Sequence, residues 1–233
     1  MPLLMDGLRR LEYRGYDSAG VVAVRDGELQ TLKAEGKLDR LKEKLEKQPL
    51  TGRYGLGHTR WATHGVPSER NAHPVVDSRR RLALIHNGII ENFLPLKKRL
   101  LAEGWTFTSD TDTEVVANLI SSYLDGGDLR AAVTRAVREL EGMYAFAVVS
   151  VETEGQEIVA ARQGPPLVIG LAEGEQFLAS DPAALLAYTK DVIFLENGDV
   201  GRLTPAGVEV RDRAGKPVER PVQRLNWDPI QAE

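Results

Sequence analysis

The sequence contains no cysteine and only four histidines among its 233 residues. The absence of cysteine excludes disulfide bonds, thiolate metal ligands and every reaction that uses a thiol of this chain. The four histidines do not have the spacing of a metal site. We therefore expect neither a metal nor another cofactor.

The chain also lacks an excess of one charge and any long apolar run. Its 30 basic and 34 acidic residues give a net charge of -4, so no basic field attracts nucleic acid or an anionic membrane. The longest apolar stretches, such as residues 144–151, are too short to span a bilayer. The first residues have neither the basic region nor the cleavage site of a signal peptide. We expect a cytoplasmic protein with a small-molecule or protein partner.

The 42% of hydrophobic residues is typical of a chain that buries a core. Apolar spacing predicts helices at residues 3–11, 38–45, 91–103, 112–124, 129–140 and 181–188. Strands are predicted at residues 19–25, 29–34, 54–59, 81–86, 144–151, 157–161, 167–171, 176–179, 192–195, 200–203 and 208–210. This order favours an α+β fold with antiparallel sheets between helices. The proline-rich residues 217–233 are expected to form an exit segment without packed structure.

Four polar clusters lie at the ends of these elements, at residues 12–20, 58–65, 85–92 and 109–114. Each cluster alone has an ordinary structural interpretation. Arg14 pairs with Asp17 at a helix end, Trp61 belongs to the core, the Asn87-Gly88 pair forms a turn, and Asp112 caps a helix. For any one cluster, this interpretation is favoured.

Taken together, the clusters carry the groups that an amino-acid substrate requires. Arg60 can bind an α-carboxylate through two hydrogen bonds, and Asp112 can pair with an α-ammonium group. Asn87 offers a side-chain N–H, and a ligand can closely approach the backbone N–H of Gly88 because glycine has no Cβ. Two such donors form an oxyanion hole, which indicates acyl transfer.

The motifs YRGYDSAG at residues 13–20, HTRWATHG at 58–65, HNGIIEN at 86–92 and TDTE at 111–114 resemble the glutaminase domain of glucosamine-6-phosphate synthase. The resemblance extends to residues 226–228, which are similar to the start of that enzyme's linker. It implies the four-layer αββα sandwich of N-terminal-nucleophile hydrolases. Residues 1–216 would be a class II glutamine amidotransferase domain, and residues 217–233 would lead toward an absent sugar-isomerase domain.

The resemblance also implies an activity and a set of roles. Glutamine would be split into glutamate and ammonia, and the ammonia would be transferred to fructose 6-phosphate in a full-length protein that can be a homodimer. The implied substrate-binding residues are Arg60 for the carboxylate, Asp112 for the ammonium group, Thr63 and His64 in the pocket wall, and Trp61 as its cap. Asn87 and Gly88 would form the oxyanion hole, and Arg14 would lie near the nucleophile. For His58, His73 and His86 we expect structural roles.

The chain departs from the family at its start. The family begins with a catalytic cysteine on an opening strand, whereas residue 1 here is methionine and neither the strand nor any cysteine is present. The missing cysteine and strand have three explanations, which are a misassigned start, a truncation and a pseudoenzyme. The intact binding motifs favour a misassigned start. We expect this chain not to hydrolyse glutamine by the thioester route, and to be poorly soluble or associated because an inner strand is missing. Two alternative functions are the glutaminase domain of amidophosphoribosyltransferase and a non-catalytic glutamine-binding module.

Overall fold

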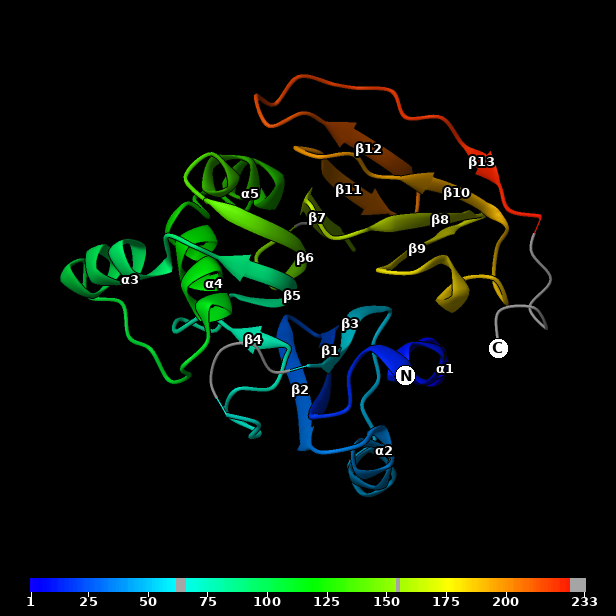
Figure 1. Ribbon diagram of the computed structural model, residues 1–233, viewed down its shortest axis with the longest axis horizontal. Helices are drawn as coiled ribbons and strands as arrows, with labels where there is room; N and C mark the ends of the chain where they lie inside the picture. Colours follow the sequence, from blue (N-terminus) through cyan, green and yellow to red (C-terminus); the bar gives the residue numbers. More distant parts are fainter. Residues whose placement is uncertain (62–65, 154–155, 227–233) are drawn as a thin grey trace.

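The computed structural model describes residues 1–61, 66–153 and 156–226. In these residues, helices α3, α4 and α5 follow one another in the middle of the chain, with most of the strands before and after them (Figure 1). The helical elements are α1 (Pro2–Leu11), η1 (Glu12–Arg14), α2 (Leu38–Lys47), α3 (Phe93–Ala102), α4 (Asp112–Ser122), α5 (Leu129–Val137) and η2 (Pro182–Ala184). The strands are β1 (Ser18–Arg25), β2 (Glu28–Glu35), β3 (Tyr54–Arg60), β4 (Val75–Val76), β5 (Leu82–Ile90), β6 (Gly142–Ser150), β7 (Ile158–Gln163), β8 (Val168–Ala172), β9 (Glu175–Ala179), β10 (Asp191–Phe194), β11 (Val200–Thr204), β12 (Gly207–Arg211) and β13 (Gln223–Arg224).

A six-stranded antiparallel sheet in the order β12-β11-β7-β6-β5-β4 forms the first β layer. Strand β6 is buried on both faces, and its alternation assigns a different kind of residue to each. Tyr144, Phe146 and Val148 join the core beneath α3, α4 and α5. Ala145 and Ala147 on the opposite face join the core shared with the second β layer. The two alanines therefore face the other sheet together with Val149, and the two aromatic side chains fill the space below the helices.

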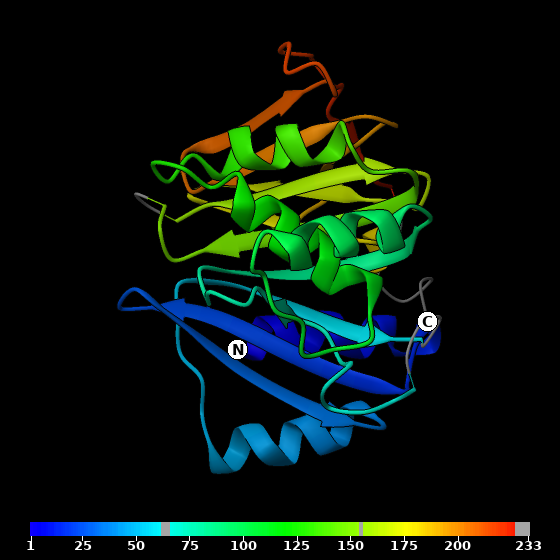
Figure 2. The same cartoon turned by 90° about the vertical axis from the view of Figure 1, so that its left-hand side faces the viewer.

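The second β layer consists of two separate sheets, β2-β1-β3 and β13-β10-β8-β9. Val22 of β1 and Ile169 of β8 pack into the core between the two layers. On the outer face of β1, Val21 packs with Leu8 of α1 and Leu41 of α2. Figure 2 shows the green helices over one face of the first layer and α2 beyond the blue strands. The predicted four-layer sandwich is confirmed.

The turn between β1 and β2 follows the prediction. Asp26 and Gly27 both have positive φ, at 52° and 75°, which is the backbone conformation of a tight hairpin turn. Register then runs regularly from Arg25 opposite Glu28 to Ser18 opposite Glu35.

Several elements differ from the prediction, among them the short strand β4, which was not expected. The strand expected to end at His86 continues as β5 through Asn87 and Gly88, because both residues pair with β6. The helix expected at 181–188 is the single turn η2, although Asp181 caps it as expected by accepting a hydrogen bond from the N–H of Ala183. The tail contains strand β13, which pairs with β10. None of the helices that the structure describes has the length and apolarity needed to cross a bilayer.

Candidate active site

A pocket of about 300 Å³ lies where the ends of β3 and β5 meet the start of α4. Its wall contains six of the predicted site residues, which are Arg14, Arg60, Trp61, Asn87, Gly88 and Asp112. They come from four separate segments of the chain. The other two predicted residues, Thr63 and His64, lie outside the described residues.

Arg60 is the last residue of β3 and is only 5% exposed. Alternation along β3 turns Leu56, His58 and Arg60 to the buried face of the strand. Burial lowers the pKa of the Arg60 guanidinium, and the nearby carboxylates of Asp17 and Asp112 act in the opposite direction. An arginine keeps its charge in proteins, so the pocket contains a buried cation.

Asp112 supplies the opposite charge from the first position of α4, where it is 4% exposed. Its Oδ2 atom accepts a hydrogen bond of 2.8 Å from the backbone N–H of Ile90. The N-terminus of a helix also stabilises a carboxylate, because the helix dipole and the free N–H groups are positive there. Asp112 is therefore fixed between β5 and α4.

The turn before α4 is held by a closed set of hydrogen bonds. Thr111 is the N-cap and accepts from the N–H of Glu114. The Glu114 carboxylate returns to the turn and accepts from the backbone N–H and the hydroxyl of both Thr108 and Ser109. Thr111 thus satisfies one free donor of the first helical turn, and the Glu114 carboxylate ties the preceding turn to α4, which restricts the position of Asp112.

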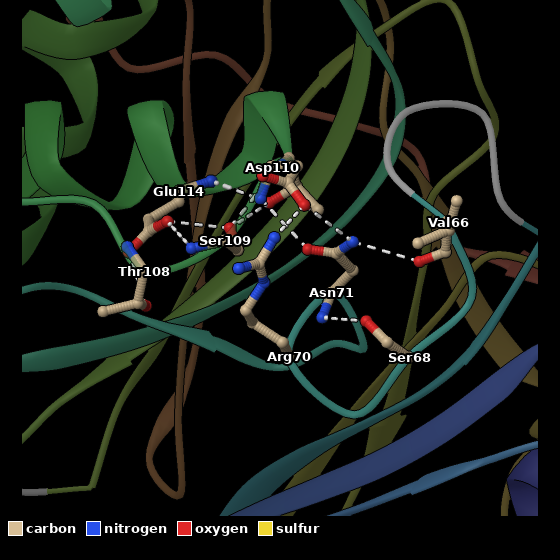
Figure 3. A network of polar contacts seen from close by, with 9 residues as sticks. Val66, Ser68, Arg70, Asn71, Thr108, Ser109, Asp110 and Glu114 are labelled. Atoms are coloured by element: carbon tan, nitrogen blue, oxygen red, sulfur yellow. Dashed lines mark hydrogen bonds and ion pairs between the residues drawn. The ribbon is translucent and has the colours of Figure 1, made fainter.

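Asn71 ties this turn to the segment that follows β3 (Figure 3). Its side-chain amide donates to the carbonyl of Val66 at 3.0 Å, and its carbonyl accepts from the N–H of Asp110 at 3.0 Å. Asn71 is fully buried, and Arg70 forms an ion pair with Asp110 beside it. The sequence motifs did not single out Asn71, because the contact joins residues about 40 positions apart.

Asn87 and Gly88 lie side by side on β5 at the pocket wall. Gly88 has φ +129°, and an added Cβ would lie 2.1 Å from the carbonyl oxygen of Met143. The position therefore requires glycine. In the described residues, β4 pairs with β5 only at Ala83 and Leu84, so this strand does not cover that edge of β5 at Asn87 and Gly88.

His58 contacts Asn87 across the two β layers. Its Nε2 lies 2.9 Å from Oδ1 of Asn87, and its ring packs against that of His73 with centroids 4.5 Å apart. Burial lowers the pKa of His58 to about 4, although the hydrogen bond with Asn87 favours the charged form. The ring is neutral at physiological pH. Sequence reasoning gave His58 a structural role and missed this contact with a site residue.

Arg14 and Trp61 depart from their ordinary interpretations. The ion pair of Arg14 is with Asp181 at 3.6 Å, and not with the expected Asp17. Arg14 also donates to the carbonyl of Ser180. Trp61 is 62% exposed and is not a core residue. It lies at the pocket with its ring 5.9 Å from that of Tyr16, which is the position expected of a cap.

A groove of about 360 Å³ adjoins the pocket and runs between β3 and β9, with α1 along it. Within the described chain, β3 and β9 each have a hydrogen-bonded neighbour on one side only. The groove and the pocket share the lining residues Leu8, Leu11, Gly57, Ile85, Leu178 and Ala179. Two open strand edges above an apolar floor form a space suited to an additional strand.

A profile of the glutamine amidotransferase domain matches residues 43–214. The chain is 54% identical over its full length to a glutamine–fructose-6-phosphate aminotransferase (isomerizing) from Symbiobacterium thermophilum, of which it covers 38%. Over 97% of the chain it is 54% identical to an enzyme of that name from Thermus thermophilus, covering 37% of it. Among solved structures, glutamine phosphoribosylpyrophosphate amidotransferase from B. subtilis superposes with a TM-score of 0.77 at 28% identity. This match covers 91% of the chain and 46% of that enzyme.

The fold is that of the glutamine amidotransferases of the N-terminal-nucleophile type. The chain belongs to the glutamine amidotransferase domain family and corresponds to the glutaminase domain of the aminotransferases to which it is similar. It spans about two fifths of the length of these curated relatives.

Proposed function

We propose that this chain is the glutaminase half of a glutamine–fructose-6-phosphate aminotransferase, which binds L-glutamine and provides its amide nitrogen for glucosamine 6-phosphate. The observation that carries the proposal is the pair of buried opposite charges, Arg60 and Asp112, in one pocket with Asn87 and Gly88. A free amino acid carries both charges, so both must be matched when it leaves water.

Each group of glutamine has a partner in this pocket. The planar guanidinium of Arg60 binds the α-carboxylate through two hydrogen bonds. The Asp112 carboxylate, with one oxygen held by Ile90, receives the α-ammonium group on the other. The side chain of glutamine then extends toward Asn87 and Gly88, whose N–H groups stabilise the negative oxygen that forms when the amide carbon is attacked.

The attacking group is not part of this sequence. With no cysteine in the chain, no thiolate can form the covalent thioester intermediate that the family resemblance implies. The purified chain is therefore expected to bind glutamine without releasing ammonia. Steady ammonia release by the chain alone would contradict this.

The remainder of the reaction requires residues beyond this chain. Because it spans about two fifths of its curated relatives, we assign the fructose 6-phosphate site to a sugar-isomerase domain that residues 217–233 lead toward. Residues 1–216 form the glutaminase domain in this assignment, and dimerisation belongs to the full-length protein.

The identities rank the alternatives. The chain is 54% identical to the isomerizing aminotransferase and 28% identical to the phosphoribosylpyrophosphate amidotransferase, which favours the first as the parent enzyme. A non-catalytic glutamine-binding module would use the same pocket. It differs from the glutaminase domain only in that no nucleophile is provided.

Isothermal titration calorimetry with L-glutamine tests the proposal. Arg60→Ala and Asp112→Asn are each expected to weaken binding by roughly 30-fold or more, because each leaves one buried charge of the complex without its partner. Arg25→Ala is the matched control, since that arginine lies at the other end of the sheet and pairs with the exposed Asp26. Absence of glutamine binding by the folded, unsubstituted chain, or equal affinities for Arg60→Ala and Arg25→Ala, would refute the proposed pocket.

A further inference from the structure

The oxyanion site depends on which end of the Asn87 side chain faces the pocket. A carboxamide has two ends of nearly the same shape, and only the Nδ2 end can donate a hydrogen bond to a negative oxygen. The Oδ1 end would repel it. Some neighbouring group must therefore select the orientation.

That neighbour is His58. Its Nε2 lies 2.9 Å from Oδ1 of Asn87, which leaves Nδ2 as the end available to a ligand. The two residues belong to different layers, with His58 on β3 and Asn87 on β5. His58 is 8% exposed and packs against His73, so its ring is held in place.

The surroundings of the ring determine where its proton lies. Nδ1 of His58 is buried and has no hydrogen-bond partner in the described part of the chain. A proton there would be a buried donor without an acceptor, which is costly, whereas a proton on Nε2 has the Asn87 carbonyl as acceptor. Because burial lowers the pKa of His58 to about 4, the ring holds a single proton near neutral pH, and that proton is on Nε2.

We propose that His58 is a positioning residue for the oxyanion site: its Nε2–H donates to Oδ1 of Asn87 and so turns Nδ2 toward the carbonyl oxygen of the bound amide. This inference rests on the proposed function, since it concerns the amide end of glutamine. It gives His58 no contact with the substrate.

Two variants separate this role from packing. His58→Leu removes the N–H and keeps an apolar side chain of similar size, whereas His58→Gln retains an amide N–H that can reach the same acceptor. Two ligands complete the test. L-Glutamine carries the side-chain amide, and L-norvaline has the same α-carboxylate and α-ammonium groups on an aliphatic side chain without an amide.

Calorimetry is expected to show that His58→Leu reduces the preference for glutamine over norvaline by about fivefold to tenfold, the effect of one hydrogen bond. His58→Gln is expected to restore it. Arg60→Ala weakens both ligands by the same factor, because both carry the carboxylate. Equal weakening of both ligands by His58→Leu would show a purely structural role and overturn the inference. Failure of the unsubstituted chain to bind either ligand would instead refute the proposed function.

If His58→Leu does not fold, nitrogen NMR of the unsubstituted chain tests the inference by locating the proton on the His58 ring. The chemical shifts of the two His58 ring nitrogens distinguish the protonated atom from the bare one. A proton on Nε2 supports the inference. A proton on Nδ1 overturns it, because Nε2 would then accept from Nδ2 of Asn87 and turn Oδ1 toward the pocket.

Discussion

Lowering the pH from 7.5 to 5.0 is expected to destabilise the protein through His58. The ring is buried beside His73, and the positive charge of Arg60 opposes a charge on it. Desolvation is the main cause, and the pKa falls from 6.5 to about 4. His73 has its pKa lowered well below 6.5 for the same main reason, so its effect has the same sign.

The size of the effect follows from proton linkage. Between pH 6.5 and 4, the unfolded chain binds a proton at His58 that the folded chain does not, so stability falls as the pH falls through this range. Each pH unit below 6.5 costs about 1.4 kcal/mol at this site. At pH 5.0 His58 alone should therefore reduce the free energy of unfolding by about 2 kcal/mol.

Urea denaturation at the two pH values measures this loss, and His58→Gln isolates it. Glutamine does not titrate, so this variant should lose about 2 kcal/mol less than the unsubstituted chain between pH 7.5 and 5.0. Carboxylates elsewhere in the chain contribute equally to both proteins and cancel in the comparison, whereas the change that the substitution causes at His73, whose pKa His58 also lowers, is part of the measured difference. An identical pH dependence in the two proteins would refute the assignment of a buried neutral His58.

Three further predictions concern the strands, the turn and the groove around the pocket. Gly88→Ala should destabilise the fold by at least about 2 kcal/mol in urea denaturation, because its Cβ would lie 2.1 Å from the Met143 carbonyl oxygen. Gly7→Ala, in α1 with open space around it, should instead stabilise by up to about 1 kcal/mol, and equal effects would contradict this reasoning. Asn71→Ala should weaken glutamine binding more than the control Asn118→Ala, which replaces an equally buried asparagine in the interior of α4. Equal glutamine affinities of the two variants would exclude a role of the turn in positioning Asp112. The groove can be tested with a synthetic peptide of about seven residues, the length of β3, that has cysteine at its amino end and aliphatic residues after it. This peptide should bind the groove and give ammonia release from glutamine that depends on Arg60. A bound peptide without ammonia release would show that the groove does not place a nucleophile at the pocket.

Sequence patterns correctly predicted the elements that are determined by neighbouring residues in the chain. The hairpin at Asp26-Gly27 and the cap at Asp181 were predicted because turn and cap residues act on their immediate neighbours. The end of β5 was mispredicted because Asn87-Gly88 is also a typical turn sequence, and only the pairing with β6 keeps it extended. Strand β13 was missed because its two residues depend entirely on the edge of β10.

Among the candidate site residues, too, some could be predicted from local motifs and others could not. Arg60, Asp112, Asn87 and Gly88 could be predicted because their chemistry matches an amino acid and they lie in recognisable motifs. His58 and Asn71 could not be assigned roles in the same way. A buried histidine or asparagine is usually a satisfied structural residue, and the contacts that distinguish these two join segments about 30 to 40 residues apart. Only the packing of the two β layers and the turn before α4 brings their partners together.

In the proposed function, the residues that bind glutamine are distinct from the group that attacks its amide. Binding and hydrolysis can therefore be measured separately. The two charges proposed to bind an amino acid are placed by β3 and by the capped start of α4, since Arg60 is the last residue of β3 and Asp112 accepts a hydrogen bond from the N–H of Ile90. The proposed reaction also needs a nucleophile, and the sequence has no cysteine that could supply a thiolate. Substitutions of Arg60 or Asp112 in this chain should therefore report on binding alone. When a nucleophile is provided, the same substitutions should lower glutamine affinity by the same factor, whereas His58→Leu should lower the rate of the attack step by more than it lowers glutamine affinity, because the Asn87 hydrogen bond strengthens as charge develops on the oxygen.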